Sequence, residues 1–156
     1  MKPYTDYEPG RSKMPDDGQD IYVFRGDPEL VNFPSTSEVF RAVFENTFYA
    51  TCIGNGKGET LEANARACKM FGYTPEEMAG LSTSDLFNTE TLSYRDYLAV
   101  RDATGKAKSV IVGIRKNGER FPCEITSLVF FEDNGERRTI NTIQDLGKNY
   151  AKRFLG

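Results

Sequence analysis

The sequence contains no histidine, and this absence removes several common kinds of chemistry. Ser-His-Asp and Cys-His nucleophilic systems are excluded in their usual forms, because both need an imidazole as general base. Zinc and haem sites with histidine ligands are excluded for the same reason. Tryptophan is also absent, which removes one common aromatic partner for flavins and stacked bases.

Long apolar runs and long basic runs are missing as well. No segment approaches the ~20 apolar residues that span a bilayer, and residues 1–10 lack the apolar centre of a secretory signal. The net charge is −3, without a cluster of Lys and Arg that would indicate a nucleic-acid or anionic membrane surface. We therefore expect a cytoplasmic protein that binds neither nucleic acid nor membrane.

Cysteine is scarce: Cys52, Cys68 and Cys123 are odd in number and widely spaced. This pattern argues against a disulfide framework and favours a reducing compartment. We interpret all three as small, buried, semi-apolar side chains rather than reactive thiols. No metal site is predicted.

The length of 156 residues suits one domain with one core. Residues 1–34 are rich in Pro, Gly, Asp and Lys and are predicted to be flexible. Within them, residues 21–24 form an apolar island that is interpreted as either an edge strand or a docking segment. The ordered domain is predicted over residues 35–147, and residues 148–156 are interpreted as the start of a C-terminal linker or signalling helix.

Capping signals predict the helices. Ser35 and Glu38 have capping-box spacing, which predicts a helix from residue 35. One face of this helix carries the apolar residues Val39, Phe40, Val43 and Phe44. Further helices are predicted at residues 64–71, 74–79, 82–87 and 90–103.

Alternating apolar residues predict strands at 48–53, 59–63, 108–116, 119–132 and 137–146. Asn117-Gly118 predicts a two-residue type I′ turn, in which both residues have positive φ. The fold class is therefore α+β: a five-stranded antiparallel sheet with short helices on one face and a flanking N-terminal helix.

Three stretches carry a resemblance to a known family. They are Asn64 followed by FGYTPEEMAG at residues 71–80, KNGERFPCEI at residues 116–125, and Gln144-Asp145-Leu146. Together, with the spacing between them, they resemble the PAS superfamily of sensor domains over about residues 37–150. The resemblance implies that Asp145 relays a signal from the sheet to a following segment.

The resemblance also implies the function. We expect a bacterial sensor or interaction module that binds a small ligand or a partner and relays the event through changed dimer geometry. Its output domain, in the same or another chain, is expected to be a histidine kinase, cyclase or transcription regulator. A ligand-free dimerisation module and, less favoured, a small enzyme on a similar scaffold remain alternatives.

In PAS-like folds the helices after the second strand cover the sheet and can enclose a cavity. The candidate lining residues are Phe71, Met78, Leu86, Tyr97, Val112, Cys123 and Ile125. A small apolar ligand is expected there, unless these side chains simply fill the core. No haem is expected because histidine is absent, and no LOV-type flavin because residues 83–88 contain no cysteine.

No catalytic residue is predicted. Gly54, Gly56 and Gly58 lack the spacing of a phosphate-binding loop and precede a strand, so they are interpreted as a hairpin turn. Glu76 and Glu77 point about 100° apart on a helix, and capping explains them.

A homodimer is predicted from the outer face of the sheet. Leu128 and Phe130 alternate with the core set of the strand at 119–132, and we expect Ile111 and Ile143 to face outward as well. Monomers rarely leave such an apolar patch in water. The helix stripe at residues 39–44 is expected to lie across this face, in its own subunit or in a symmetry mate, and to complete a two-fold interface. The alternative is that the helix only covers its own sheet and the protein is a monomer.

Overall fold

The computed structural model describes residues 11–14, 21–24 and 36–150. The chain divides into two compact parts, residues 1–41 and 42–156. In the first part, β1 (Arg11–Met14) and β2 (Ile21–Phe24) pair antiparallel, so the apolar island of the N-terminal segment is a strand. Helix α1 (Thr36–Asn46) includes the division between the two parts.

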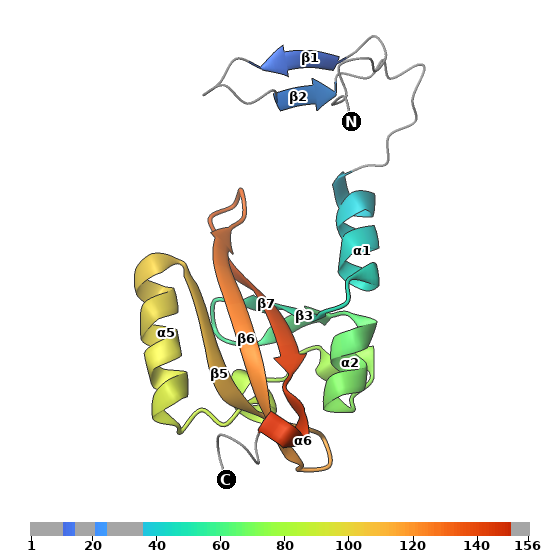
Figure 1. Cartoon of the computed structure of the whole chain (residues 1–156). Helices are drawn as coiled ribbons and strands as arrows, with labels where there is room; N and C mark the ends of the chain where they lie inside the picture. The colour runs from blue at the N-terminus through green and yellow to red at the C-terminus, as the bar shows by residue number, and fades with distance from the viewer. Residues whose placement is uncertain (1–10, 15–20, 25–35, 151–156) are drawn as a thin grey trace. The chain divides into compact units, whose positions relative to one another are not determined.

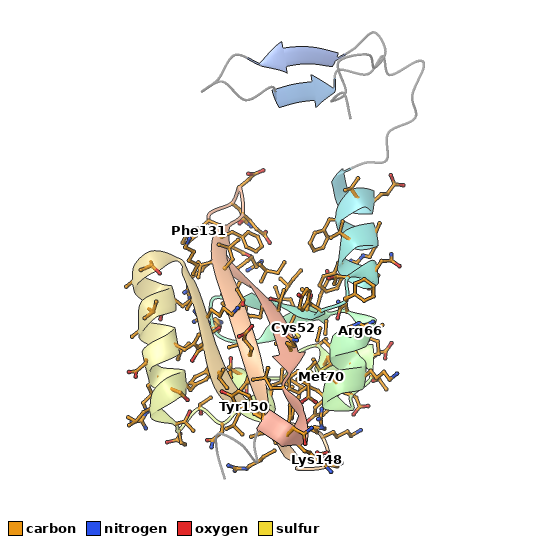
Figure 2. The ribbon with its side chains drawn as sticks, in the orientation of Figure 1. Cys52, Arg66, Met70, Phe131, Lys148 and Tyr150 are labelled. Carbon is orange, nitrogen blue, oxygen red and sulfur yellow. The ribbon has the colours of Figure 1, made fainter. Side chains whose placement is uncertain are left out.

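The second part is built on a five-stranded antiparallel sheet with the order β4-β3-β7-β6-β5 (Figure 1). The strands are β3 (Ala50–Asn55), β4 (Thr60–Ala63), β5 (Lys106–Ile114), β6 (Arg120–Phe131) and β7 (Arg137–Asp145). Between β4 and β5 lie α2 (Ala65–Phe71), α3 (Pro75–Met78), α4 (Thr83–Leu86) and α5 (Leu92–Thr104). After β7 comes the short helix α6 (Gly147–Tyr150), on which Figure 2 shows Lys148 and Tyr150. The predicted fold class is confirmed.

The helix ends follow the local signals in the sequence. The side chain of Asn64 accepts from the backbone N–H of Ala67 at 2.9 Å and starts α2. The Thr74 hydroxyl accepts from the backbone N–H of Glu77 at 3.1 Å and starts α3. Gly72 terminates α2 with a φ of 84°, in the left-handed region that favours glycine.

The connection between β5 and β6 is not the predicted type I′ turn. The N–H of Gly118 donates to the carbonyl of Arg115 at 2.9 Å, and the N–H of Arg115 donates to the carbonyl of Glu119 at 2.9 Å. Gly118 has a φ of 87°, whereas no non-glycine residue in the described part of the chain has a positive φ. The connection is therefore a three-residue loop, residues 116–118, in which a type I turn ends at the left-handed Gly118. Asn117 supports this form, because its side-chain oxygen accepts from the N–H of Glu119 at 2.9 Å.

The core lies between one face of the sheet, here called the inner face, and helices α2 to α5. Three aromatic rings lie near its centre: the ring centroid of Phe71 is 5.6 Å from that of Phe87 and 5.6 Å from that of Phe121. All three cysteines are buried and unpaired, as predicted. Burial raises the pKa of Cys52 and of Cys123 to about 12, so both remain thiols at neutral pH.

The phase of β5 and β7 differs from the prediction. Ile111 and Ile143 are each 1% exposed and face the core, not the outer face. Val112 pairs with Pro122 in register and lies on the opposite, outer face from Ile111. The error arose because Val110, Val112 and Ile114 form the more apolar alternating set of β5, although they belong to its outer side.

The outer face still carries an apolar patch. Leu128 on β6 pairs with Ile140 on β7, and Ile140 pairs with Ile53 on β3, so the three lie in one cross-strand row. Leu128 is 50% exposed, and Phe130, two residues further along the same face, is 38% exposed. We refer to Ile53, Leu128, Phe130 and Ile140 as the outer patch. At the end of β6, Phe131 is 67% exposed (Figure 2).

The helix α1 presents only part of its predicted stripe. Val39, Phe40 and Val43 are 46%, 40% and 65% exposed. Phe44, in contrast, is 3% exposed within the single chain. Phe44 is therefore a buried residue of its own subunit, and the prediction that it contributes to a dimer interface is wrong.

Candidate ligand-binding site

A cavity of about 320 Å³ lies between the inner face of the sheet and helices α4 and α5, beside the β3–β4 loop. Part of its wall is apolar and comes from helices and strands alike. These residues are Leu86, Phe87, Leu98, Ile125 and Ile143. The volume is at the small end of the ~300–1,000 Å³ that is usual for small-molecule sites.

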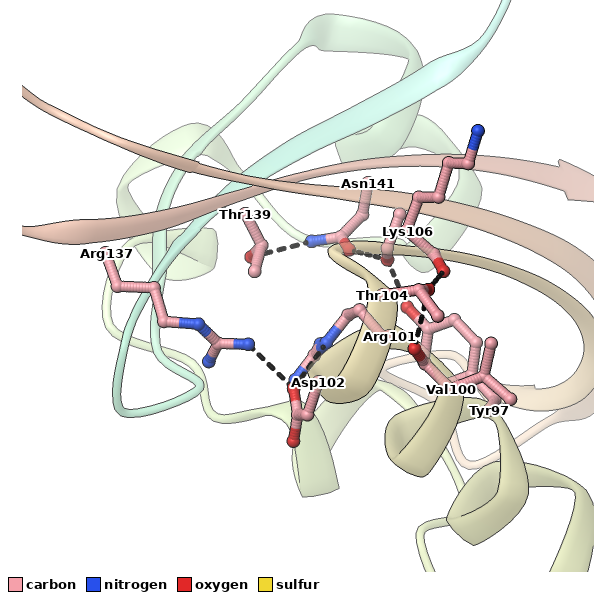
Figure 3. Close-up of polar contacts among 10 residues, drawn as sticks. Tyr97, Val100, Arg101, Asp102, Thr104, Lys106, Arg137, Thr139 and Asn141 are labelled. Atoms are coloured by element: carbon pink, nitrogen blue, oxygen red, sulfur yellow. Dashed lines mark hydrogen bonds and ion pairs between the residues drawn. The ribbon is translucent and has the colours of Figure 1, made fainter.

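Three polar side chains of the wall, Tyr97, Thr139 and Asn141, belong to a chain of hydrogen bonds that passes through Ser127 behind them. The Tyr97 hydroxyl from α5 makes a short contact with the Ser127 hydroxyl on β6, which in turn donates to the side-chain oxygen of Asn141 on β7. The Asn141 amide donates to the hydroxyl of Thr139 at 3.4 Å (Figure 3). Ser127 is 1% exposed, so this chain holds polar groups deep in the core.

Two arginines and one aspartate form the polar edge of the cavity, here called the Arg–Asp edge. The Arg137 guanidinium on β7 donates to Asp102 Oδ1 on α5 at 2.7 Å, and the Arg101 guanidinium donates to the same oxygen at 3.3 Å (Figure 3). Burial acts to raise the pKa of Asp102, but the hydrogen bonds and charges of Arg137 and Arg101 outweigh it and hold the pKa below its ordinary value. Asp102 is therefore ionised at neutral pH.

Two phenols also line the cavity. Burial raises the pKa of Tyr94 and of Tyr97 above the ordinary value, and the hydrogen bond with Ser127 only partly offsets this for Tyr97. Both are neutral hydroxyl groups at neutral pH, so they can donate or accept a hydrogen bond. Cys52 lines the same cavity as an un-ionised thiol.

The predicted pocket residues divide into three groups. Leu86, Tyr97 and Ile125 line the cavity. Phe71, Met78 and Cys123 are buried in the core cluster and do not line the cavity. Val112 lies on the outer face of β5 and cannot reach the cavity.

Sequence reasoning missed the polar residues of the site. Thr139 and Asn141 lie two residues apart and face inward on β7, in alternation with Ile140 and Thr142. A polar residue at an inward position of a strand is a signal of a cavity or a buried network. The contribution of Arg101 and Asp102 has no comparable signal, because a charged turn at the end of a helix is usually solvated.

Asp145 occupies a junction at the end of β7. One carboxylate oxygen accepts from the Arg115 guanidinium at 2.6 Å, and the other accepts from the backbone N–H of Gly147, the first residue of α6, at 2.8 Å. Arg115 also donates to the carbonyl of Met70 at 2.5 Å and lies 3.9 Å above the Phe121 ring. The start of α6 is thus tied to α2, to the β5–β6 hairpin and to an aromatic ring of the core.

Other kinds of site are not found in the described ranges. No cluster of three or more Cys, Asp or Glu side chains with metal-binding geometry occurs among these residues. None of the helices described is long and apolar enough to cross a bilayer. Residues 55–59 form a hairpin turn between β3 and β4, in which Gly58 donates to the carbonyl of Asn55 at 3.2 Å.

The family model of the PAS domain matches residues 49–148, which is most of the chain. The chain therefore belongs to the PAS domain family, whose members are sensory and regulatory modules. A comparison with curated protein sequences finds no significant match.

Solved structures show the same fold at low sequence identity. A PAS domain from a two-component sensor histidine kinase has a TM-score of 0.62 at 16% identity, covering 76% of this chain and 99% of that one. The PAS domain of a LuxR-family transcriptional regulator from Burkholderia thailandensis, in complex with ethanol, has a TM-score of 0.58 at 16% identity, with 69% and 96% covered. A LOV protein from Rhodobacter sphaeroides has a TM-score of 0.59 at 20% identity, with 72% and 67% covered.

Proposed function

We propose that this PAS domain is a sensor module that binds a small ligand in the cavity and relays occupancy through a changed dimer geometry. The observation that carries the proposal is the cavity of about 320 Å³, lined by both apolar and hydrogen-bonding side chains. A domain that served only as a dimerisation surface would have no need to keep Asn141 and Tyr97 beside an open volume in its core.

The relay is proposed to pass through Asp145. Asp145 lies at the end of β7, pairs with Cys123 near the start of β6, and accepts a hydrogen bond from the N–H of Gly147, the first residue of α6. A ligand that displaces β6 and β7 therefore changes the position of Asp145 and of the start of α6. Arg115 connects the same carboxylate to the core. The output, in this chain or another, is proposed to be a histidine kinase, a cyclase or a transcription regulator. A histidine kinase and a transcription regulator are among the proteins that contain the similar structures.

The dimer is proposed to form through the outer patch and Val43 of α1. Leu128 and Phe130 remain half exposed in the single chain, and Val43 is 65% exposed. Burial of large apolar side chains contributes about 1.5–3 kcal/mol each when it is complete. A second copy of this chain gives that burial with a self-complementary patch.

Light scattering tests the dimer with a double variant, Val43→Ser with Phe130→Ser. Both positions are exposed, so the substitutions leave the core unchanged. We expect a dimer for the wild type and a monomer for the variant. The matched control is Leu92→Ser, at a residue that is 75% exposed at the start of α5 and outside the patch. A wild type that is monomeric at micromolar concentration removes the dimer from the proposal.

Native mass spectrometry of the purified protein separates the sensor from the ligand-free alternative. We expect added mass that is lost on unfolding, or saturable binding of an added small molecule. We further propose that the protein holds neither haem nor a flavin that reacts covalently. An absorption spectrum with a Soret band, or with the blue-light band of a flavin, contradicts that part.

A further inference from the structure

The Arg–Asp edge of the cavity has more positive than negative charge. The charged residues of the lining are Lys57, Glu59, Arg101, Asp102 and Arg137, which sum to one positive charge. Both guanidiniums converge on one oxygen of Asp102, although a guanidinium can bind two carboxylate oxygens side by side. The edge is therefore suited to a second carboxylate.

The position of Arg101 strengthens this argument. Its side chain is only 16% exposed, and among the residues that the structure describes it forms one ion pair, the 3.3 Å contact with Asp102. Asp102 itself is 55% exposed and makes its shorter contact, at 2.7 Å, with Arg137. A largely buried guanidinium with a long and shared ion pair is stabilised when a further anion approaches it.

The interior of the cavity is suited to an uncharged body. Beyond the Arg–Asp edge, the lining includes Leu86, Phe87, Ile125 and Ile143, together with the side-chain amide of Asn141. The volume of about 320 Å³ accommodates a compact body such as one aromatic ring or a short aliphatic chain.

We infer that the ligand of this cavity is a small carboxylate with an apolar body, whose carboxylate binds Arg101 and Arg137 while its body occupies the space beside Leu86 and Ile125. This inference rests on the proposed sensor function and names its ligand class. Asp102 then acts as an internal competitor, which occupies the two guanidiniums until a ligand carboxylate displaces it.

Calorimetric titration of the full chain tests the inference with benzoate and benzamide, which share a ring and differ in charge. We expect saturable binding of benzoate and binding of benzamide that is weaker by about tenfold or more, because the amide lacks the charge-assisted hydrogen bonds. Phenyl phosphate is the third probe. If it binds more tightly than benzoate, the assignment to carboxylates is overturned in favour of phosphate esters.

Neighbouring arginines provide matched variants. Arg137 faces the cavity, whereas Arg138 faces the outer side of β7 and pairs with Glu132 and Glu136. We expect Arg137→Gln to weaken benzoate binding by about tenfold, and Arg138→Gln to leave it unchanged. Equal losses in the two variants overturn the inference.

Asp102→Asn gives the sharpest readout, because its expected direction is opposite to that of a structural loss. Removal of the competing carboxylate should tighten benzoate binding, whereas a purely supporting role for Asp102 predicts weaker binding.

Absence of saturable binding for benzoate, phenylacetate and hexanoate alike also overturns the ligand class. If benzamide binds the cavity as tightly as benzoate, the carboxylate assignment is overturned and the proposed sensor function is retained. If carboxylates bind without any change in the dimer, the ligand class is retained and the proposed relay through dimer geometry is overturned.

Discussion

Asn64 connects three elements of the fold, and its removal gives a strong test of the packing. Its side chain is 0% exposed. The oxygen accepts from the N–H of Thr51 at 3.0 Å and of Ala67 at 2.9 Å, and the amide donates to the carbonyls of Phe44 at 2.8 Å and Tyr49 at 3.0 Å. The end of α1, the start of β3 and the start of α2 thus depend on one side chain.

Asn64→Ala leaves four backbone groups without this partner. Each buried polar group that loses its partner costs about 1–3 kcal/mol, and water that enters the gap recovers part of this. We expect the free energy of unfolding to fall by about 3–5 kcal/mol. At roughly 2–4 °C for each kcal/mol in a chain of this size, the melting temperature should fall by about 10 °C.

The control is Asn117→Ala, which removes one exposed hydrogen bond, from the N–H of Glu119 to the Asn117 side chain at 2.9 Å. That variant should lose at most about 1 kcal/mol. Both are measured by thermal and urea unfolding, followed by circular dichroism. If the two variants melt within a degree or two of each other, the reasoning about Asn64 is refuted.

Two further predictions concern glycines and thiols. Gly113→Ala places a Cβ 2.5 Å from the Phe121 ring, although the backbone φ there suits alanine. Gly118→Ala meets no atom within 4 Å, but its φ of 87° is unfavourable for alanine. Each variant should lower the free energy of unfolding by about 1–3 kcal/mol, measured by urea unfolding. Adding Phe121→Leu should reduce the stability loss of Gly113→Ala but not that of Gly118→Ala. If Phe121→Leu does not reduce the loss of Gly113→Ala, the predicted clash is contradicted. Because folding raises the pKa of Cys52 and Cys123 to about 12, their contribution to stability is complete below the unfolded value of about 8.5 and is lost as pH rises toward 12. A thiol reagent at mildly alkaline pH should therefore label the unfolded chain and leave the native chain unmodified; rapid labelling of the native chain speaks against burial.

The helices could be predicted from the sequence because their signals are local. Asn64, Thr74 and Gly72 act within one turn of the helix that they start or end, so the chain around them is enough to place it. The five antiparallel strands followed from the resemblance to the PAS family and from the hairpin turns.

The phase of β5 and the polar edge of the cavity could not be predicted in the same way. Both faces of β5 are apolar, so alternation alone does not show that Ile111 faces the core; the pairing with Cys123 decides it. Asp102 and Arg137 are 35 residues apart and meet only in the folded domain, where α5 packs against β5 and β6. Such contacts depend on tertiary structure and leave no periodic signal.

The central claim, that occupancy of the cavity changes the dimer at its C-terminal end, is tested most directly by a distance measurement. Lys148 is exposed on α6, three residues after Asp145, and the buried native thiols allow a spin label to be placed selectively at Lys148→Cys. Electron paramagnetic resonance then gives the label-to-label distance in the dimer. We predict that benzoate shifts the distance distribution in this protein, and that the same shift requires about tenfold more benzoate when Arg137→Gln is added. A distribution that stays the same with and without bound benzoate contradicts the claim.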